Sequence, residues 1–217
     1  MTVTRPDNAP PIVGILIVVL AATAVAAVRT LLEARGMWTA SGTMGVSLLP
    51  FVLVWGTMMT AMMFPSVTPF ATLYLRSLDD HRTARAASFL AGYALLWTAS
   101  GVAAYALAIG ADHVVSAGGA APRLFAAAIF GVTALFYLTP LKYRMLGHCL
   151  HPLGLLIGYG AYRGASRDLR AGLHHGVICL GCCWALMALM AVFGMMNVIA
   201  MVSIAVVVAL EKHWSDG

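Results

Sequence analysis

Six apolar runs account for about half of the chain, and most of them are close to the length that crosses a membrane. They cover residues 12–28, 47–64, 86–110, 124–138, 173–193 and 198–210. A transmembrane helix needs about 20 mostly apolar residues, so the last two runs are together too long for one crossing. We therefore predict an all-α, polytopic transmembrane helical bundle with about six spans and a tight turn at residues 194–197.

The composition indicates a membrane environment. Of the 217 residues, 61% are hydrophobic and only 10% are charged, whereas a soluble domain carries about a quarter charged residues. The net charge of +5 does not indicate nucleic-acid binding, because the basic residues lie in short segments between the apolar runs. We expect the lipid bilayer, and no nucleic acid, to be a partner.

The chain fits a single membrane domain. We predict a mobile N-terminal tail at residues 1–11 and one transmembrane domain at residues 12–213. Residues 150–162 are apolar but too short to cross, and such runs are more often re-entrant or interfacial. The first run resembles a signal peptide, but it exceeds the usual apolar length of about 7–15 residues, so we expect it to remain as an anchor.

Basic residues set the predicted orientation. With six spans and the N-terminus inside, the inner segments hold ten of the 13 basic residues, and the outer segments hold Arg29, Arg35 and Arg123. Inner segments of membrane proteins carry an excess of Lys and Arg. We therefore expect a multi-pass protein with both termini on the cytoplasmic side.

Two histidines and three cysteines open the fifth apolar run. Residues three or four apart share a helix face, so His175, Cys179 and Cys182 or Cys183 form one stripe of metal-ligating side chains. Inside a membrane such groups have few partners unless they bind something. The inner side is reducing, so a structural disulfide is a poor interpretation. The alternative is that the thiols only pack against neighbouring helices.

Methionines accumulate near the inner end of the second apolar run. Met59, Met62 and Met63 share a face and lie at about the depth of the cysteines. Soft thiolate and thioether ligands favour copper(I) over hard cations, while zinc would also accept the Cys and His groups. The sequence therefore favours a copper(I) site between these two stripes, and simple packing of flexible methionines is the alternative.

Three glycines lie in one region of the cysteine helix. Gly172, Gly176 and Gly181 permit the close approach of another helix. We expect that neighbour to be the methionine helix.

Other possible ligands lie outside the main stripe. Residues 147–152 form a loop in this topology, and ligands there could relay a metal ion toward the cysteines. The candidates for this secondary or relay role are His148, Cys149, His151, His174 and Met187. His174 and His175, together with methionines, could instead ligate haem, although no spacing requires it.

Several function classes find no support in the sequence. No GxSxG, P-loop, HExxH or CxxCH motif is present. The acidic residues fall at the ends of the predicted spans or in loops, which disfavours a proton-coupled transporter. Glu211 and Lys212 are interpreted as interfacial charges at the end of the last span. An enzymatic activity is therefore not the favoured interpretation.

A set of motifs across residues 45–213 resembles a known family. The motifs are Ala61-Met62-Met63-Phe64-Pro65, Leu138-Thr139-Pro140-Leu141-Lys142, His175-Gly176 followed by Cys179-Leu180-Gly181-Cys182-Cys183-Trp184, and Glu211-Lys212. They resemble the bacterial DUF2182 family, whose members are described as predicted metal-binding integral membrane proteins. The resemblance implies a bacterial cytoplasmic (inner) membrane protein in which the histidine, cysteines and methionines of the two stripes matter.

The chain departs from that family pattern in one place. Family members often carry two cysteines, four residues apart, after the second motif. Here Met145 stands at the first position, and Cys149 keeps the second. Methionine can bind copper(I) but is a poor zinc ligand, so the departure favours copper and adds Met145 to the secondary candidates.

The leading hypothesis is an integral membrane protein that handles copper(I) through His175, the three cysteines of the stripe and the three methionines. It would deliver the ion to a copper enzyme or help to assemble one, or move the ion into or across the membrane. One alternative is a structural subunit or scaffold of a larger membrane complex. Another is a metal- or haem-dependent redox component.

Overall fold

Helices make up nearly all of the part of the chain that the structure describes. The computed structural model describes residues 21, 24, 25, 28, 29, 32, 42, 43, 45–78, 81–195 and 197–213. The helices are α2 (Leu48–Arg76), α3 (Arg82–Ala117), α4 (Ala121–Tyr137), α5 (Pro140–Leu150), α6 (Pro152–Gly160), α7 (Arg167–Ala188), α8 (Met190–Phe193) and α9 (Val198–His213). No strand occurs among the described residues, which confirms the all-α prediction. The predicted tail at 1–11 and most of the first span lie outside them.

Three helices are long and apolar enough to cross a membrane. They are Leu48–Tyr74, Thr83–Ala117 and Arg167–Phe193. Ala121–Tyr137 and Pro140–Leu150 meet at an angle of 64° and would make a fourth span if the bent pair crosses as one unit. Helix α9 has 16 residues, which is shorter than the usual crossing of about 20 residues. The described part of the chain thus contains three or four candidate spans, and the count of about six stays a prediction.

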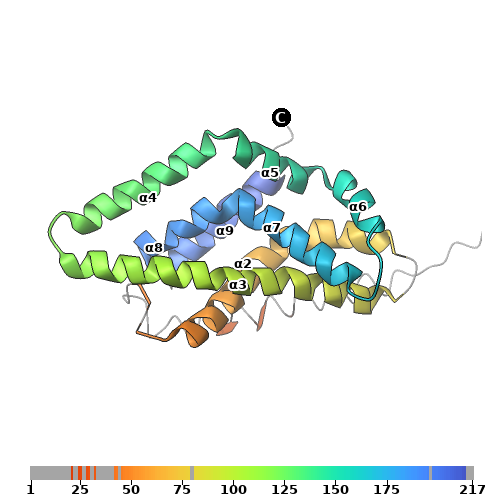
Figure 1. The fold of residues 1–217 in the computed structure, drawn as a ribbon, viewed down its shortest axis with the longest axis horizontal. Coiled ribbons are helices and arrows are strands. Elements are labelled where there is room, and N and C mark those ends of the chain that lie inside the picture. The colour runs from red at the N-terminus through yellow and green to blue at the C-terminus, as the bar shows by residue number, and fades with distance from the viewer. Residues whose placement is uncertain are drawn as a thin grey trace, which may run out of the picture.

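Helix α3 is the central support of the bundle. It packs along both α2 and α7, and α7 also packs against α5. Figure 1 shows α7 running between the long α3 and the arc formed by α4 and α5. The cysteine-bearing helix is therefore enclosed on opposite sides by other helices.

Glycines allow α3 and α7 to cross at close range. A Cβ added at Gly172 would lie 2.0 Å from the Phe89 carbonyl oxygen, and one at Gly92 would lie 2.2 Å from the Leu169 carbonyl oxygen. Gly176 faces Leu96, which also belongs to α3. The expectation that the glycines pack against the methionine helix was wrong for Gly172 and Gly176, because their partner is α3.

Helix α2 continues beyond the proline at which its predicted span ended. Pro65 and Pro69 lie inside the helix, and each lacks the backbone donor of an ordinary helical residue. Hydroxyls of Ser66 and Thr68 donate to the carbonyls of Met63 and Phe64 at 2.8 Å. Such local partners let membrane helices tolerate proline, and the extension carries several side chains of the site.

The predicted loop before residue 152 is instead a helix. Pro140 begins α5, and the Thr139 hydroxyl accepts a hydrogen bond from the Lys142 backbone at 3.4 Å. Threonine as the N-cap, followed by proline, is a common helix start. Cys149 and His148 therefore lie on helix α5 and not in a flexible loop. Pro152 then begins α6, so residues 150–160 are largely helical.

One acidic residue at the end of a candidate span is buried. Asp168 is buried in the first turn of α7. It accepts hydrogen bonds from Arg85 at 3.0 Å and from Tyr74 at 2.5 Å. Buried charges are stable when paired and hydrogen-bonded. The ion pair joins α3 to α7, and the hydrogen bond from Tyr74 adds α2.

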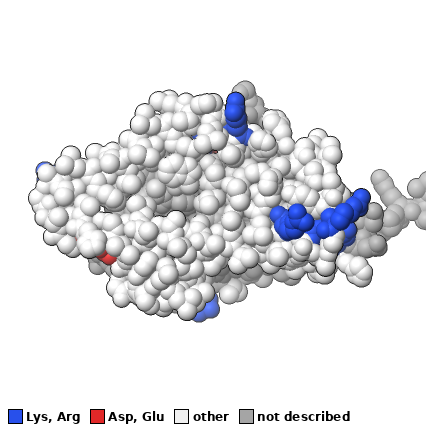
Figure 2. Space-filling model, in the orientation of Figure 1, with Lys and Arg blue, Asp and Glu red and all other residues white. Residues whose placement is uncertain are grey.

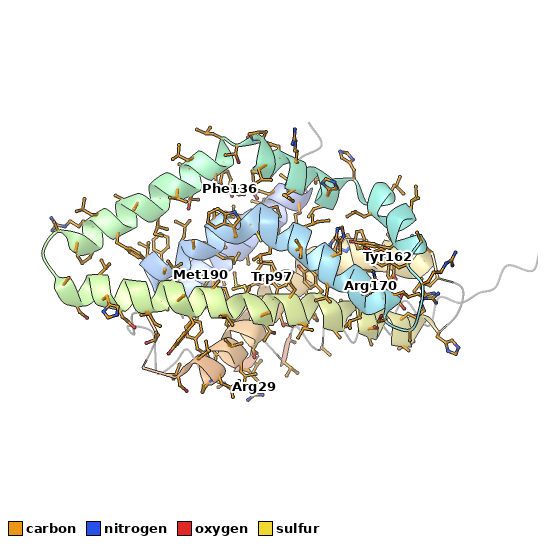
Figure 3. All side chains as sticks on the ribbon, viewed as in Figure 1. Arg29, Trp97, Phe136, Tyr162, Arg170 and Met190 are labelled. Atoms are coloured by element: carbon orange, nitrogen blue, oxygen red, sulfur yellow. The ribbon has the colours of Figure 1, made fainter. Side chains whose placement is uncertain are left out.

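Basic side chains gather at one end of the molecule. Figure 2 shows Lys and Arg grouped where α6 leads into α7, while most of the remaining visible surface is uncharged. Arg163 and Arg170 are exposed there. In Figure 3, Arg170 and Tyr162 mark this end, and Met190 of α8 lies toward the other end. A long apolar body with a basic end is compatible with a membrane protein.

Candidate metal centre

Three cysteines of α7 converge on one point in the core. The sulfur atoms of Cys179, Cys182 and Cys183 all lie within 4.8 Å of one another. Their exposed fractions are 0%, 1% and 1%, and none of them forms a disulfide. Spacings of three and four residues place the side chains on one helix face. We call these three residues the cysteine cluster.

A shared acceptor helps to orient two of the thiols. The thiols of Cys182 and Cys183 both donate to the backbone carbonyl of Cys179, at 3.0 and 2.9 Å. Thiol hydrogen bonds are weak, so a metal ion could replace them at little cost. The sulfurs are thus grouped before any ion arrives.

A fourth cysteine reaches the cluster from another helix. The Cys149 side chain of α5 packs against the core that holds the cysteine cluster and lies beside Cys182. It is only half-buried, whereas the three cluster thiols are buried. Met145 lies one turn earlier on α5, and its sulfur is 3.4 Å from the position that a Cβ on Gly181 would take. The structure therefore places Met145 and Cys149 beside the cysteine cluster.

Two polar side chains contact the Cys179 sulfur, and the sequence interpretation missed both. The Lys212 ammonium donates to it at 2.9 Å, and the Tyr93 hydroxyl lies 3.0 Å from it. Lys212 also donates to the Ser66 hydroxyl at 3.2 Å. The sequence feature that could have identified Lys212 was the Glu211-Lys212 pair in the family motif.

A buried lysine supports the cluster from behind. Lys142 is 2% exposed, and its ammonium donates to the Cys182 carbonyl at 2.9 Å and to Glu211 at 2.6 Å. Tyr137 donates to the other carboxylate oxygen of Glu211 at 2.5 Å. These contacts join α4, α5, α7 and α9 around the cysteine cluster. Glu211 is thus a half-buried partner of Lys142, although the sequence analysis interpreted it only as an interfacial charge.

His175 lies one helical turn before Cys179 and is 3% exposed. Its ring stacks on Phe70 with the ring centroids 4.0 Å apart. Its Nδ1 atom has no hydrogen-bond partner among the described residues. An unpaired buried polar nitrogen is costly, and a metal ion or a bound ligand would relieve that cost.

The other predicted histidines lie away from the cysteine cluster. His174 is exposed and pairs with the Tyr159 hydroxyl at 3.0 Å. His148 is exposed and pairs with the Arg144 carbonyl of its own helix at 2.6 Å. His151 is exposed at the junction of α5 and α6. The structure brings none of these three rings into the group of sulfurs.

The methionine stripe is buried in the same apolar core as the cysteines. Met59 and Met63 have exposed fractions of 0%, and Met62 and Met187 are also buried. Helices α2 and α7 both pack along α3, and they meet each other where the Phe70 ring stacks on His175. Ser66 continues the stripe by one turn and contacts Lys212, which contacts Cys179. One polar bridge thus joins the end of the stripe to the cluster.

A cavity of about 370 Å³ opens beside the cysteine cluster. Its lining comes from α2, α5, α7 and α9 and includes Ser66, Phe70, Arg76, Cys149, His175 and Lys212. We call it the cation-lined cavity, because its two charged side chains are Arg76 and Lys212. It gives access to Cys149, the least buried of the four thiols.

The grouped donors suit a soft metal ion. Thiolates, a thioether and imidazole select copper(I) or zinc, and hard cations such as magnesium prefer oxygen ligands. The cysteine cluster offers three thiols within one small volume, with Cys149 and Met145 alongside. The residues present therefore fit a soft metal ion such as copper(I).

A family model describes most of the chain. The model of the PpoB2 family, whose description is copper chaperone, matches residues 52–217. The matched region contains all four cysteines, the methionine stripe and both cationic residues of the cavity. No curated protein and no solved structure matches the chain.

Proposed function

This chain belongs to the PpoB2 family of copper chaperones, and we propose that it binds copper(I) in a membrane and hands it to a copper enzyme or another copper-requiring protein. The observation that carries the proposal is the cysteine cluster, with three buried sulfurs within 4.8 Å of one another. A chaperone must hold its ion away from water and still release it. Buried thiols joined to a half-buried fourth thiol meet both needs.

The ligand assignment follows from the arrangement of the sulfurs. We assign the cysteine cluster as the primary ligands, with Cys149 and His175 next to it. Copper(I) accepts two or three soft ligands without a fixed tetrahedral geometry, whereas structural zinc is almost always four-coordinate and tetrahedral. Three thiols on a single helix face suit the lower coordination number, so copper(I) is favoured over zinc.

The methionine stripe is proposed as a weaker set of ligands. Met59, Met62 and Met63 are buried, and Ser66 and Lys212 connect the end of their stripe to Cys179. Thioethers bind copper(I) without a proton to lose. They could accept an ion that leaves the cysteine cluster along α2.

Copper analysis of the purified protein tests this function. Wild type and Cys182→Ser/Cys183→Ser are purified in detergent, without chelator, from copper-supplemented cells. We expect copper bound to wild type and at least a tenfold lower affinity in the variant, because two of the soft ligands are lost. Ala188→Ser, on the same helix but outside the cluster, controls for the added hydroxyl and should bind copper normally.

The rival functions give different results in the same preparation. Equal copper in wild type and the double cysteine variant would contradict the ligand assignment. A stably co-purifying partner with no metal in either protein would favour a structural subunit. A visible haem spectrum would favour a redox component, since copper(I) is colourless. The DUF2182 resemblance stays a prediction, as do the cytoplasmic orientation of both termini and the single domain at residues 12–213.

A further inference from the structure

The four thiols differ in how they can be reached. Cys149 lines the cation-lined cavity, while the three thiols of the cysteine cluster are absent from its walls. Cys149 is half-buried and lies beside Cys182, which is 1% exposed. An ion that comes through the cavity therefore meets Cys149 first. From Cys149 the next sulfur is that of Cys182, inside the core.

The walls of the cavity carry positive charge. Arg76 is exposed at the C-terminal end of α2, and Lys212 lies further in, between Ser66 and Cys179. No acidic side chain of the described residues lines the cavity. A bare cuprous ion is a cation, and two cationic side chains would repel it. The charge of the cavity suits an anion.

The size of the cavity suits a small molecule. Its volume of about 370 Å³ falls in the range of about 300–1,000 Å³ that is usual for small-ligand pockets. Phe70 and Leu150 give part of the wall an apolar character. A folded carrier protein could not enter a space of this size, whereas a short thiol-bearing peptide could.

We propose that the cation-lined cavity receives copper(I) as a small anionic thiolate complex and that Cys149 is the first acceptor of the ion. This inference rests on the proposed copper(I) function and adds the form of the cargo and the order of the ligands. Arg76 and Lys212 attract the negative charge of the carrier. Arg76 guides the carrier at the mouth of the cavity, and Lys212 acts next to the cysteine cluster.

The transfer is a thiolate exchange without a redox change. The sulfur of Cys149 forms a bond to copper, and the bond between copper and one carrier thiolate breaks. The proton of the Cys149 thiol passes to the departing carrier thiolate, and copper stays in the +1 state throughout. Repetition of the exchange with Cys182 moves the ion into the core and releases Cys149.

His175 supplies a second donor at the cavity. It lines the cavity, it is 3% exposed, and its Nδ1 has no partner among the described residues. A two-coordinate copper(I) ion held by Cys149 and this imidazole would satisfy the nitrogen. His175 lies on α7 one turn before Cys179. Its side chain therefore connects the wall of the cavity to the cysteine cluster.

Loading kinetics with two donors test the proposal. Purified protein receives copper(I) either as its glutathione complex, which is anionic, or as its acetonitrile complex, which is cationic. Ultraviolet thiolate-to-copper absorbance follows the rate, and metal analysis gives the final copper content. We expect Arg76→Gln to slow loading from the glutathione complex about fivefold or more, through lost electrostatic attraction. Loading from the acetonitrile complex should not slow.

Two further variants complete the design. Arg163→Gln removes an exposed arginine outside the cavity and should load like wild type from both donors. Cys149→Ser should slow loading from both donors about tenfold or more, because the first ligand exchange loses its nucleophile. It should still reach a final copper content near that of wild type, because the cysteine cluster is intact.

Each outcome separates this inference from the proposed function. If wild type binds no copper(I) from either donor, the proposed function fails and the inference fails with it. If wild type binds copper(I) but Cys149→Ser loads at the wild-type rate, Cys149 is not the first acceptor. Equal slowing of Arg76→Gln with both donors, or no slowing with either, would overturn the anionic form of the cargo.

Discussion

Two sulfur-rich stripes lie in the core of this protein, and they differ in their surroundings. The cysteines of α7 contact ammonium and hydroxyl groups from α3, α5 and α9, and their sulfurs converge. The methionines of α2 are equally buried in the same apolar core, but a thioether has no proton to donate and is only a weak acceptor. Burial and soft ligands alone therefore do not define a metal centre. Buried polar groups that hold the ligands distinguish the cysteine stripe.

The largest expected effect comes from the buried lysine behind the cysteine cluster. Lys142→Met leaves Glu211 without its ammonium partner at 2.6 Å. Breaking a buried ion pair on one side is strongly destabilising, so we expect the free energy of unfolding to fall by about 3 kcal/mol. Thermal unfolding in detergent measures the change. The double variant Lys142→Met/Glu211→Gln should recover part of the loss, and no recovery would show that the pair is not the cause.

The next effect comes from the close crossing of α3 and α7. Gly172→Ala places a Cβ 2.0 Å from the Phe89 carbonyl oxygen, so the two helices must separate. Overpacking of this kind costs about 1–3 kcal/mol of stability, and it would also move Cys179 away from Tyr93. Gly131→Ala is the matched control, since its new Cβ meets no atom within 4 Å. Equal melting temperatures for the two variants would contradict the tight crossing.

A smaller effect is expected from one hydroxyl at the cluster. Tyr93→Phe removes the contact of 3.0 Å with the Cys179 sulfur. A hydrogen bond contributes about 1 kcal/mol net, so we expect copper(I) affinity to fall about fivefold. Competition with a chromophoric copper(I) chelator measures it. Tyr105→Phe, on the same helix but bonded to the Val46 carbonyl, should leave the affinity unchanged.

The smallest effect is expected in the methionine stripe. Met59→Leu/Met63→Leu conserves side-chain volume, and such exchanges cost less than about 1.5 kcal/mol. We expect both the melting temperature and the copper(I) affinity of the cysteine cluster to change little, with affinity within about threefold. A tenfold loss of copper(I) affinity would instead show that the methionines contribute as much to binding as the cysteines. The two stripes would then not differ in function.

The sequence predicted some of the site because its ligands are local. Cys179, Cys182 and Cys183 are three and four residues apart, and helical periodicity alone puts them on one face. The all-α class followed equally directly from the apolar runs. The helix that carries Cys149 was missed, because residues 147–152 lie between the predicted spans and were interpreted as a loop. The N-cap at Thr139 and the tertiary packing of α5 make this segment helical.

The sequence by itself determined the helical class, the apolar character and the placement of the three cysteines on one helix face, because these depend on composition and on residues one turn apart. Only the tertiary structure decided that α2 and α7 both pack along α3, that Cys149 lies beside Cys182, and that Lys142 and Lys212 turn inward. Those contacts join residues 33–146 positions apart, and no local pattern specifies which distant partner a buried charge will find. The physical reason is that a buried ammonium must be paired, and its partner is set by which helices pack together.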